Sequence, residues 1–129
     1  DETSLALIGK LPSPVEPEEL SVFVKQAFGI ERLRSSRLVG EPVSKVAVCG
    51  GSGSSFIPQA MEAGVQLFIT GDISYHHFFC PEGFMVMDIG HYESERDIVD
   101  KLYEILSKKI PTFAIHTFWN NNNNPIFYF

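Results

Sequence analysis

Cysteine, basic clusters and long apolar runs are all scarce in this sequence. Two cysteines, Cys49 and Cys80, are too few for a disulfide scaffold and form no Cys-x-x-Cys pair, so we expect small packed thiols in a reducing, cytoplasmic compartment. No apolar run approaches the ~20 residues that span a bilayer, and the first ten residues do not resemble a signal peptide. Ten basic against 16 acidic residues give a net charge of −6, which argues against nucleic acid or an anionic membrane as a partner.

The remaining composition is that of one globular domain. Of the 129 residues, 44% are hydrophobic and 20% are charged, which supplies enough apolar side chain for a core. The chain begins at Asp1 rather than at a methionine. We therefore expect residues 1–129 to form a single domain, which is either a whole protein or a piece of a longer one.

Apolar runs alternate with helix-like segments along the chain. An apolar stripe at helical spacing predicts a helix over about residues 17–28, and residues 31–38 favour an edge strand or an extended connector. Short apolar runs that end at glycine, histidine or polar residues predict four strands, at 45–49, 65–70, 84–89 and 112–116. Between them we expect helices at about 56–63 and 92–109 and a short amphipathic segment at 74–80.

This order is typical of βαβ units, so we predict an α/β fold with a mainly parallel sheet flanked by helices. Residues 1–43 would form the leading helix and connector, residues 44–116 the core, and residues 117–129 an asparagine-rich tail.

A glycine-serine loop at residues 50–55 joins a predicted strand to a predicted helix. Its backbone N–H groups and hydroxyls are suited to an anion, with Gly51, Ser52 and Gly53 as candidate substrate contacts. The loop is neither a P-loop nor a dinucleotide fingerprint. A tight turn in which Ser54 or Ser55 caps the helix explains the same serines.

Residues 70–77 follow the next predicted strand and carry three titratable side chains. Asp72 is a candidate to orient a histidine or to bind substrate, and His76 or His77 to act as acid, base or metal ligand. In the alternative interpretation Asp72 caps a helix and one of the histidines only packs.

His91 and Glu95 lie one helical turn apart after the third predicted strand, close enough to share one cation. An imidazole nitrogen with a carboxylate oxygen suits zinc, iron or manganese, although two ligands fall short of the usual four. Alternatively, His91 caps the helix and the glutamates complement its dipole.

Three stretches, in this order and at these separations, resemble the C-terminal half of the Nif-three-like proteins: KVAVCGGSGSSFI, AGVQLFITGDISYHHFF and MVMDIGHYESE. These are dinuclear-metal-centre proteins, also called GTP cyclohydrolase I type 2 homologues. The resemblance covers nearly the whole chain and implies a cytoplasmic protein of two related lobes, assembled as a homohexameric ring. It also implies two divalent metal ions per complete site, with ligands from an HYxxE motif that corresponds to His91 and Glu95.

The same resemblance implies that half of the metal site is missing from this chain. The family's other ligands, a His-His pair and an Asp, come from an N-terminal lobe, and the GDISYHH segment is not that pair. His76 is instead expected to line the internal cavity of the homohexameric ring as a catalytic residue.

Our first hypothesis is the metal-binding lobe of a GTP cyclohydrolase-like, metal-dependent hydrolase that acts on a small anionic or nucleotide-like substrate and is inactive alone. The substrate would contact Gly51, Ser52, Gly53 and Asp72. The alternatives are a non-enzymatic oligomeric scaffold or regulatory protein, and an isolated nucleotide-binding domain that uses residues 50–55.

Overall fold

The computed structural model describes residues 6–96 and 125–129. The chain divides into two compact units, Asp1–Ser94 and Glu95–Phe129, and the fold described here is that of the first. Among the residues that the structure describes, no helix has the length and apolarity needed to cross a bilayer.

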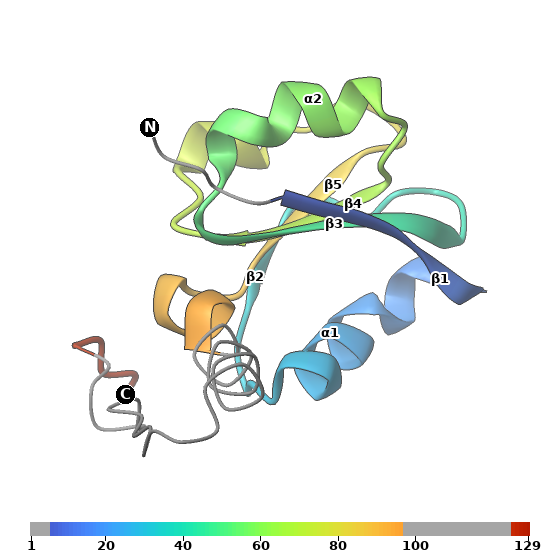
Figure 1. Ribbon diagram of the computed structural model, residues 1–129. Helices are drawn as coiled ribbons and strands as arrows, with labels where there is room; N and C mark the ends of the chain where they lie inside the picture. Colours follow the sequence, from blue (N-terminus) through green and yellow to red (C-terminus); the bar gives the residue numbers. More distant parts are fainter. Residues whose placement is uncertain (1–5, 97–124) are drawn as a thin grey trace, which may run out of the picture. The chain divides into compact units, whose positions relative to one another are not determined.

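A five-stranded sheet with the order β1-β3-β4-β5-β2 forms the centre of the first unit (Figure 1). Three parallel strands lie in the middle, namely β3 (Val43–Ser52), β4 (Leu67–Gly71) and β5 (Met85–Asp88). The edge strands β1 (Ala6–Val15) and β2 (Arg34–Ser35) run antiparallel to their neighbours. The predicted α/β class with a mainly parallel sheet is confirmed.

One helix covers each face of the sheet (Figure 1). Helix α1 (Leu20–Phe28) follows a 3-10 turn, η1 (Pro17–Glu19), and ends at Gly29, whose φ of 62° is the left-handed cap that glycine favours. Helix α2 (Ile57–Glu62) follows the 3-10 turn η2 (Ser54–Phe56). Both helices lie where the sequence predicts them, to within two residues at most ends.

Two apolar clusters hold these layers together, one on each face of the sheet. Leu20 and Val24 of α1 pack against a cluster that includes Leu67 and Ile69 of β4. On the other face, α2 packs against a cluster that includes Phe68. Because successive side chains of a strand point to opposite faces, the uninterrupted apolar run of β4 serves both clusters.

Strand β1 was not predicted, because Pro12 and Pro14 indicated an approach to a helix rather than a strand. The structure tolerates both prolines because β1 is an edge strand, where a missing N–H costs no ladder hydrogen bond, and its pairing with β3 is irregular between Lys10 and Val15. The predicted helix at 92–109 is helical over residues 91–96, and the rest of it, the strand at 112–116 and the asparagine run lie outside the described residues.

Candidate functional site

Three loops converge at one edge of the sheet, as the sequence predicts. The parallel strands β3, β4 and β5 are adjacent, so the segments that follow them, beginning at Gly53, Asp72 and Ile89, leave from the same edge. Ligands of open α/β sheets bind at this edge. Its candidate residues fall into two groups, an Asp–His pair and a cavity with two histidines.

Asp72 and His91 form the first group. The His91 Nδ1 atom lies 2.5 Å from an Asp72 carboxylate oxygen, and the two side chains are 45% and 54% exposed. Asp72 has a positive φ of 51°, a conformation that aspartate adopts more readily than most residues. It does not cap the following turn, η3 (Tyr75–Phe78), whose N-cap is Ser74. Asp72 therefore orients a histidine, but that histidine is His91 rather than His76 or His77.

Close approach of two backbones makes this pairing possible. A Cβ atom added to Gly71 would lie 2.8 Å from the His91 Cα and N atoms and 2.9 Å from the Gly90 carbonyl carbon. Only glycine leaves room for that approach. The loop after β5 can thus lie directly against the end of β4, which places His91 beside Asp72.

A buried carboxylate, Asp88 at the end of β5, holds the segments beside both members of the pair. It accepts hydrogen bonds from the backbone N–H groups of Ile73 and Gly90, each at 2.9 Å, and it forms an ion pair with Arg34 of β2. The Arg34 guanidinium also donates to the Ile73 carbonyl at 2.9 Å and lies 5.0 Å from the centre of the Phe78 ring. Asp88 is therefore a positioning residue for the loops after β4 and β5.

Two N–H groups of the glycine-serine loop donate hydrogen bonds to side chains within the protein. Gly51 N–H donates to the Ser94 hydroxyl at 2.8 Å, and Gly53 N–H donates to the Thr70 hydroxyl at 2.9 Å. Thr70 in turn donates to the Gly51 carbonyl at 2.9 Å. These two N–H groups are thus engaged in this conformation, and the exposed Ser52 is the member of the predicted substrate trio that faces solvent.

Neither Ser54 nor Ser55 makes a side-chain cap on the helical turns that follow them. The capping explanation of these serines is therefore not what the structure shows. Ser54 instead has a buried hydroxyl oxygen with no hydrogen-bond partner among the described residues.

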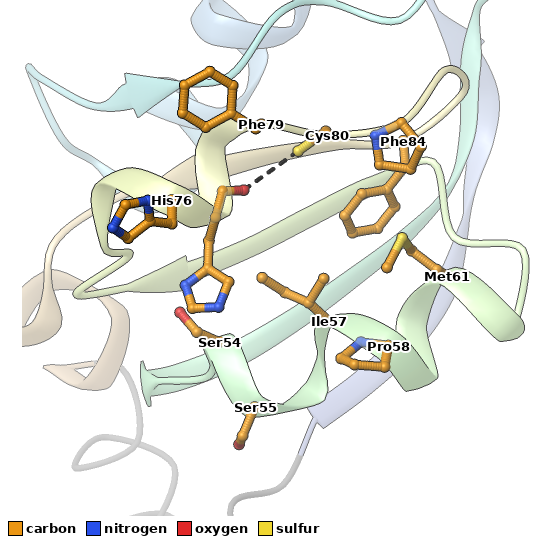
Figure 2. Close-up of a pocket in the computed structure, with 11 residues that line it drawn as sticks. Ser54, Ser55, Ile57, Pro58, Met61, His76, Phe79, Cys80 and Phe84 are labelled. Atoms are coloured by element: carbon orange, nitrogen blue, oxygen red, sulfur yellow. Dashed lines mark hydrogen bonds between the residues drawn. The ribbon is translucent and has the colours of Figure 1, made fainter.

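His76 and His77 belong to the second group, a cavity of about 420 Å³ between the η2–α2 segment and η3 (Figure 2). Ser54 and Ser55 line the same cavity. His77 is held by a contact of 2.8 Å between its Nδ1 atom and the Ser74 hydroxyl, whereas the His76 ring meets Tyr75 edge to face at 5.7 Å between ring centres. Asp72 and His91 do not line this cavity.

Both cysteines are free thiols. Burial raises the pKa of the Cys49 and Cys80 thiols above the ordinary value, and hydrogen bonds from Thr70 and Ser36, respectively, offset part of that effect. Both therefore remain neutral thiols at neutral pH, which matches their predicted role as packed side chains.

The donor types at the Asp–His pair suit a divalent metal, but the number of donors does not complete a site. Within residues 6–96 and 125–129, no three His, Cys, Asp or Glu side chains come together in a metal-binding arrangement. A histidine that binds metal usually directs its other ring nitrogen at a carboxylate, and the contact of His91 Nδ1 with Asp72 has that form. Glu95 lies in the same helical stretch, residues 91–96, but belongs to the second unit.

Sequence reasoning missed Thr70, Asp88, Ser94 and Arg34, which organise these loops. A signal for two of them exists, because Thr70 and Asp88 are polar residues at the ends of otherwise apolar strand runs, and both are buried. A buried polar residue at the carboxyl end of a strand needs partners, and here the partners are loop backbones. Ser94 and Arg34 carry no comparable signal.

The comparison with known families finds one that matches residues 1–125, described as Duf34/NIF3 (NGG1p interacting factor 3). The GTP cyclohydrolase 1 type 2 homolog of Streptococcus pneumoniae is 37% identical over 110 residues, which are 78% of this chain and 41% of that protein. Protein SA1388 of Staphylococcus aureus has a crystal structure that superposes with a TM-score of 0.81 at 25% identity, over 97% of this chain and 37% of that one.

A Bacillus cereus protein related to NIF3 has a similar structure, with a TM-score of 0.77 at 27% identity over 97% of this chain and 36% of that one. In each of these comparisons the chain spans less than half the length of the protein that it matches.

Proposed function

The chain belongs to the Duf34/NIF3 family, and on that premise we propose that it is the metal-binding lobe of a dinuclear, GTP cyclohydrolase-like hydrolase. The observation that carries this proposal is the 2.5 Å contact between His91 Nδ1 and the Asp72 carboxylate. That contact orients the imidazole and would leave Nε2 as the nitrogen available to a metal. The names of the relatives support the family, and the metal and the hydrolysis are our proposal.

His91 and Glu95 would hold the metal together with ligands from outside this chain. Two such ligands leave a divalent ion under-coordinated, so binding to this lobe alone should be weak. A bound divalent ion of this kind, whether zinc, iron or manganese, lowers the pKa of a bound water and polarises an electrophilic centre. We propose two ions in the complete site.

The chain's own residues would position the substrate. Ser52, the exposed last residue of β3, would contact a small anionic or nucleotide-like substrate. Gly51 and Gly53 would shape the loop, because their N–H groups already donate to other protein groups and not to a substrate. Asp72 orients His91, and His76, exposed on η3, is the candidate to hand over a proton.

Calorimetric titration of the chain with Zn²⁺ or Mn²⁺ tests the metal proposal. We expect measurable binding that falls at least tenfold in His91→Ala and Glu95→Ala, and roughly 10- to 100-fold in Asp72→Ala because the imidazole loses its orienting partner. His77→Ala is the matched control and should bind as the wild type does, since His77 belongs to the cavity. Equal binding by His91→Ala and the wild type would contradict the proposal.

The hydrolase part needs the missing ligands, so it is tested on a fusion of this lobe to the upstream lobe of a relative. We expect metal-dependent turnover of GTP or a phosphoester that is lost in His91→Ala and reduced in His76→Ala.

The second candidate function is a non-enzymatic metal-binding scaffold, favoured by one feature of the outer strand β1. Leu7 and Ile8 of β1 are 70% and 50% exposed, and within residues 6–96 and 125–129 this strand is paired on one side only. Such an edge suits assembly of copies, including the hexameric ring that the resemblance implies. A fusion that assembles and binds metal but shows no turnover would favour this candidate. Either function is compatible with the proposed cytoplasmic location, where two free thiols would stay reduced.

A further inference from the structure

We propose that the cavity between α2 and η3 is a second ligand site, separate from the metal pair, that takes a small fused aromatic ring carrying one N–H or O–H donor. Its volume of about 420 Å³ falls in the range of small-molecule sites, which are typically about 300–1,000 Å³. Neither Asp72 nor His91 lines it, so binding there requires no metal, although His76, the proposed proton donor, belongs to the same wall.

Apolar side chains form most of the cavity wall (Figure 2). Ile57, Pro58 and Met61 come from α2, while Phe79 and Phe84 come from the segments on either side of Pro81. Phe79 is 71% exposed and Met61 38% exposed, so apolar surface of this wall is in contact with water. A flat ring between these walls would remove apolar surface from water on both of its faces.

One polar group in the wall lacks a partner. The Ser54 hydroxyl oxygen is buried and makes no hydrogen bond within the part of the chain that the structure describes, whereas Ser55 is exposed. Figure 2 shows Ser54 turned toward the other lining side chains and Ser55 pointing away from them. An unsatisfied buried oxygen is costly, and a donor on a bound ring would satisfy it after a small rotation of the side chain.

His77 lines the same cavity and is already held in place. Its Nδ1 atom contacts the Ser74 hydroxyl at 2.8 Å, which fixes the plane of the imidazole ring. Ser54 and His77 thus give the cavity a polar side, to which Ser55 and His76 also contribute, while most of the remaining wall is apolar. This division matches a ligand with a ring body and a single polar substituent.

Indole is a suitable probe, because it combines a fused ring with one N–H, and 1-methylindole is its partner without the donor. We expect millimolar indole to shift the NMR signals of the cavity residues, and 1-methylindole to bind roughly three- to tenfold more weakly. Ser54→Ala should remove that difference between the two probes, while Ser55→Ala should keep it. Binding should be unchanged by EDTA, which separates this proposal from the metal site.

A matched pair of variants on α2 tests the location. Met61→Lys places a charged chain in the apolar wall and should weaken indole binding at least fivefold, whereas Gln59→Lys puts the same charge on the exposed part of the helix outside the cavity and should not. Both side chains are exposed, so both variants should fold.

Cys80 provides a second readout, since it lines the cavity while Cys49 is only 1% exposed. Indole should slow alkylation of Cys80 by iodoacetamide several-fold. The proposal is overturned if indole up to about 10 mM, roughly ten-thousandfold above the Kd of a 1 μM site, gives no shifts and no protection. It is equally overturned if the two lysine variants bind alike, or if Ser54→Ala leaves the preference for indole intact.

Discussion

Replacing Gly71 by alanine tests how tightly the loops after β4 and β5 pack against each other. The new Cβ would lie 2.8 Å from two backbone atoms of His91, where ordinary carbon contacts are about 3.5–4.0 Å. Backbone atoms cannot rotate away as a side chain can, so the loop after β5 must move by roughly half an ångström or more. Overpacking of this kind costs about 1–3 kcal/mol, and we expect a value near the upper end.

Urea unfolding and thermal melting measure that cost. For a unit of this size a loss of about 2–3 kcal/mol lowers the melting temperature by roughly 10–20 °C. The displaced His91 would also leave its 2.5 Å contact with Asp72. The metal affinity that we propose for His91 should then fall by about 10-fold or more in protein that is still folded at the assay temperature.

Gly40→Ala is the matched control for Gly71→Ala. A Cβ atom at Gly40 meets nothing within 4 Å, and its φ is not in the left-handed region. We expect this substitution to leave the free energy of unfolding unchanged, or to raise it by about 0.4–1 kcal/mol because alanine lowers the conformational entropy of the unfolded chain. A Gly71→Ala variant that loses less than about 0.5 kcal/mol, with wild-type metal binding, would refute the close approach described here.

Three further predictions concern buried polar groups and thiols. Asp88→Ala leaves two loop N–H groups without an acceptor and should lower the free energy of unfolding by about 2–5 kcal/mol in urea titrations, which a wild-type midpoint would contradict. Ser54→Ala removes an unsatisfied buried oxygen, so it should be neutral or stabilising in the same assay, as should Ser55→Ala on the surface; a loss above about 1 kcal/mol at Ser54 alone would show that its hydroxyl has a partner. Burial raises the pKa of the Cys80 thiol, so its alkylation rate should rise with pH to a midpoint above that of a free thiol, and the folded state should lose the corresponding stability above about pH 8.5. An alkylation midpoint for Cys80 at or below the free-thiol pKa would contradict this prediction, provided that Cys49 does not react at any pH in the series.

The core of the fold follows from periodicity in the sequence. Mainly apolar runs such as residues 65–70 indicate strands buried on both faces. The glycines that follow α1 and α2 mark the helix ends through their left-handed backbone. The sharing of one edge by three loops follows from parallel strand order alone. Strand β1 could not be predicted this way, since Pro12 and Pro14 only fit a strand that has an unpaired side.

Pairing within the site depends on tertiary contacts that spacing does not encode. His91 and Asp72 are 19 residues apart, and they meet because Gly71 permits close packing and Asp72 adopts a positive φ. The sequence indicates both residues as candidates, but it does not show whether Asp72 contacts His76, His77 or His91. The cavity depends on the distance between α2 and η3, which local propensity does not determine.

Each pair of the three loops is joined by a buried side chain that bonds to a backbone group. Thr70 and Ser94 hold the glycine-serine loop to β4 and to the helical stretch after β5, and Asp88 holds the loop after β4 to that after β5. Three loops joined in this way have no member that opens alone. Their amide hydrogens, those of Gly51 and Gly53 among them, should therefore exchange with deuterium in a single cooperative opening, and the whole edge of the sheet should behave as one foldon.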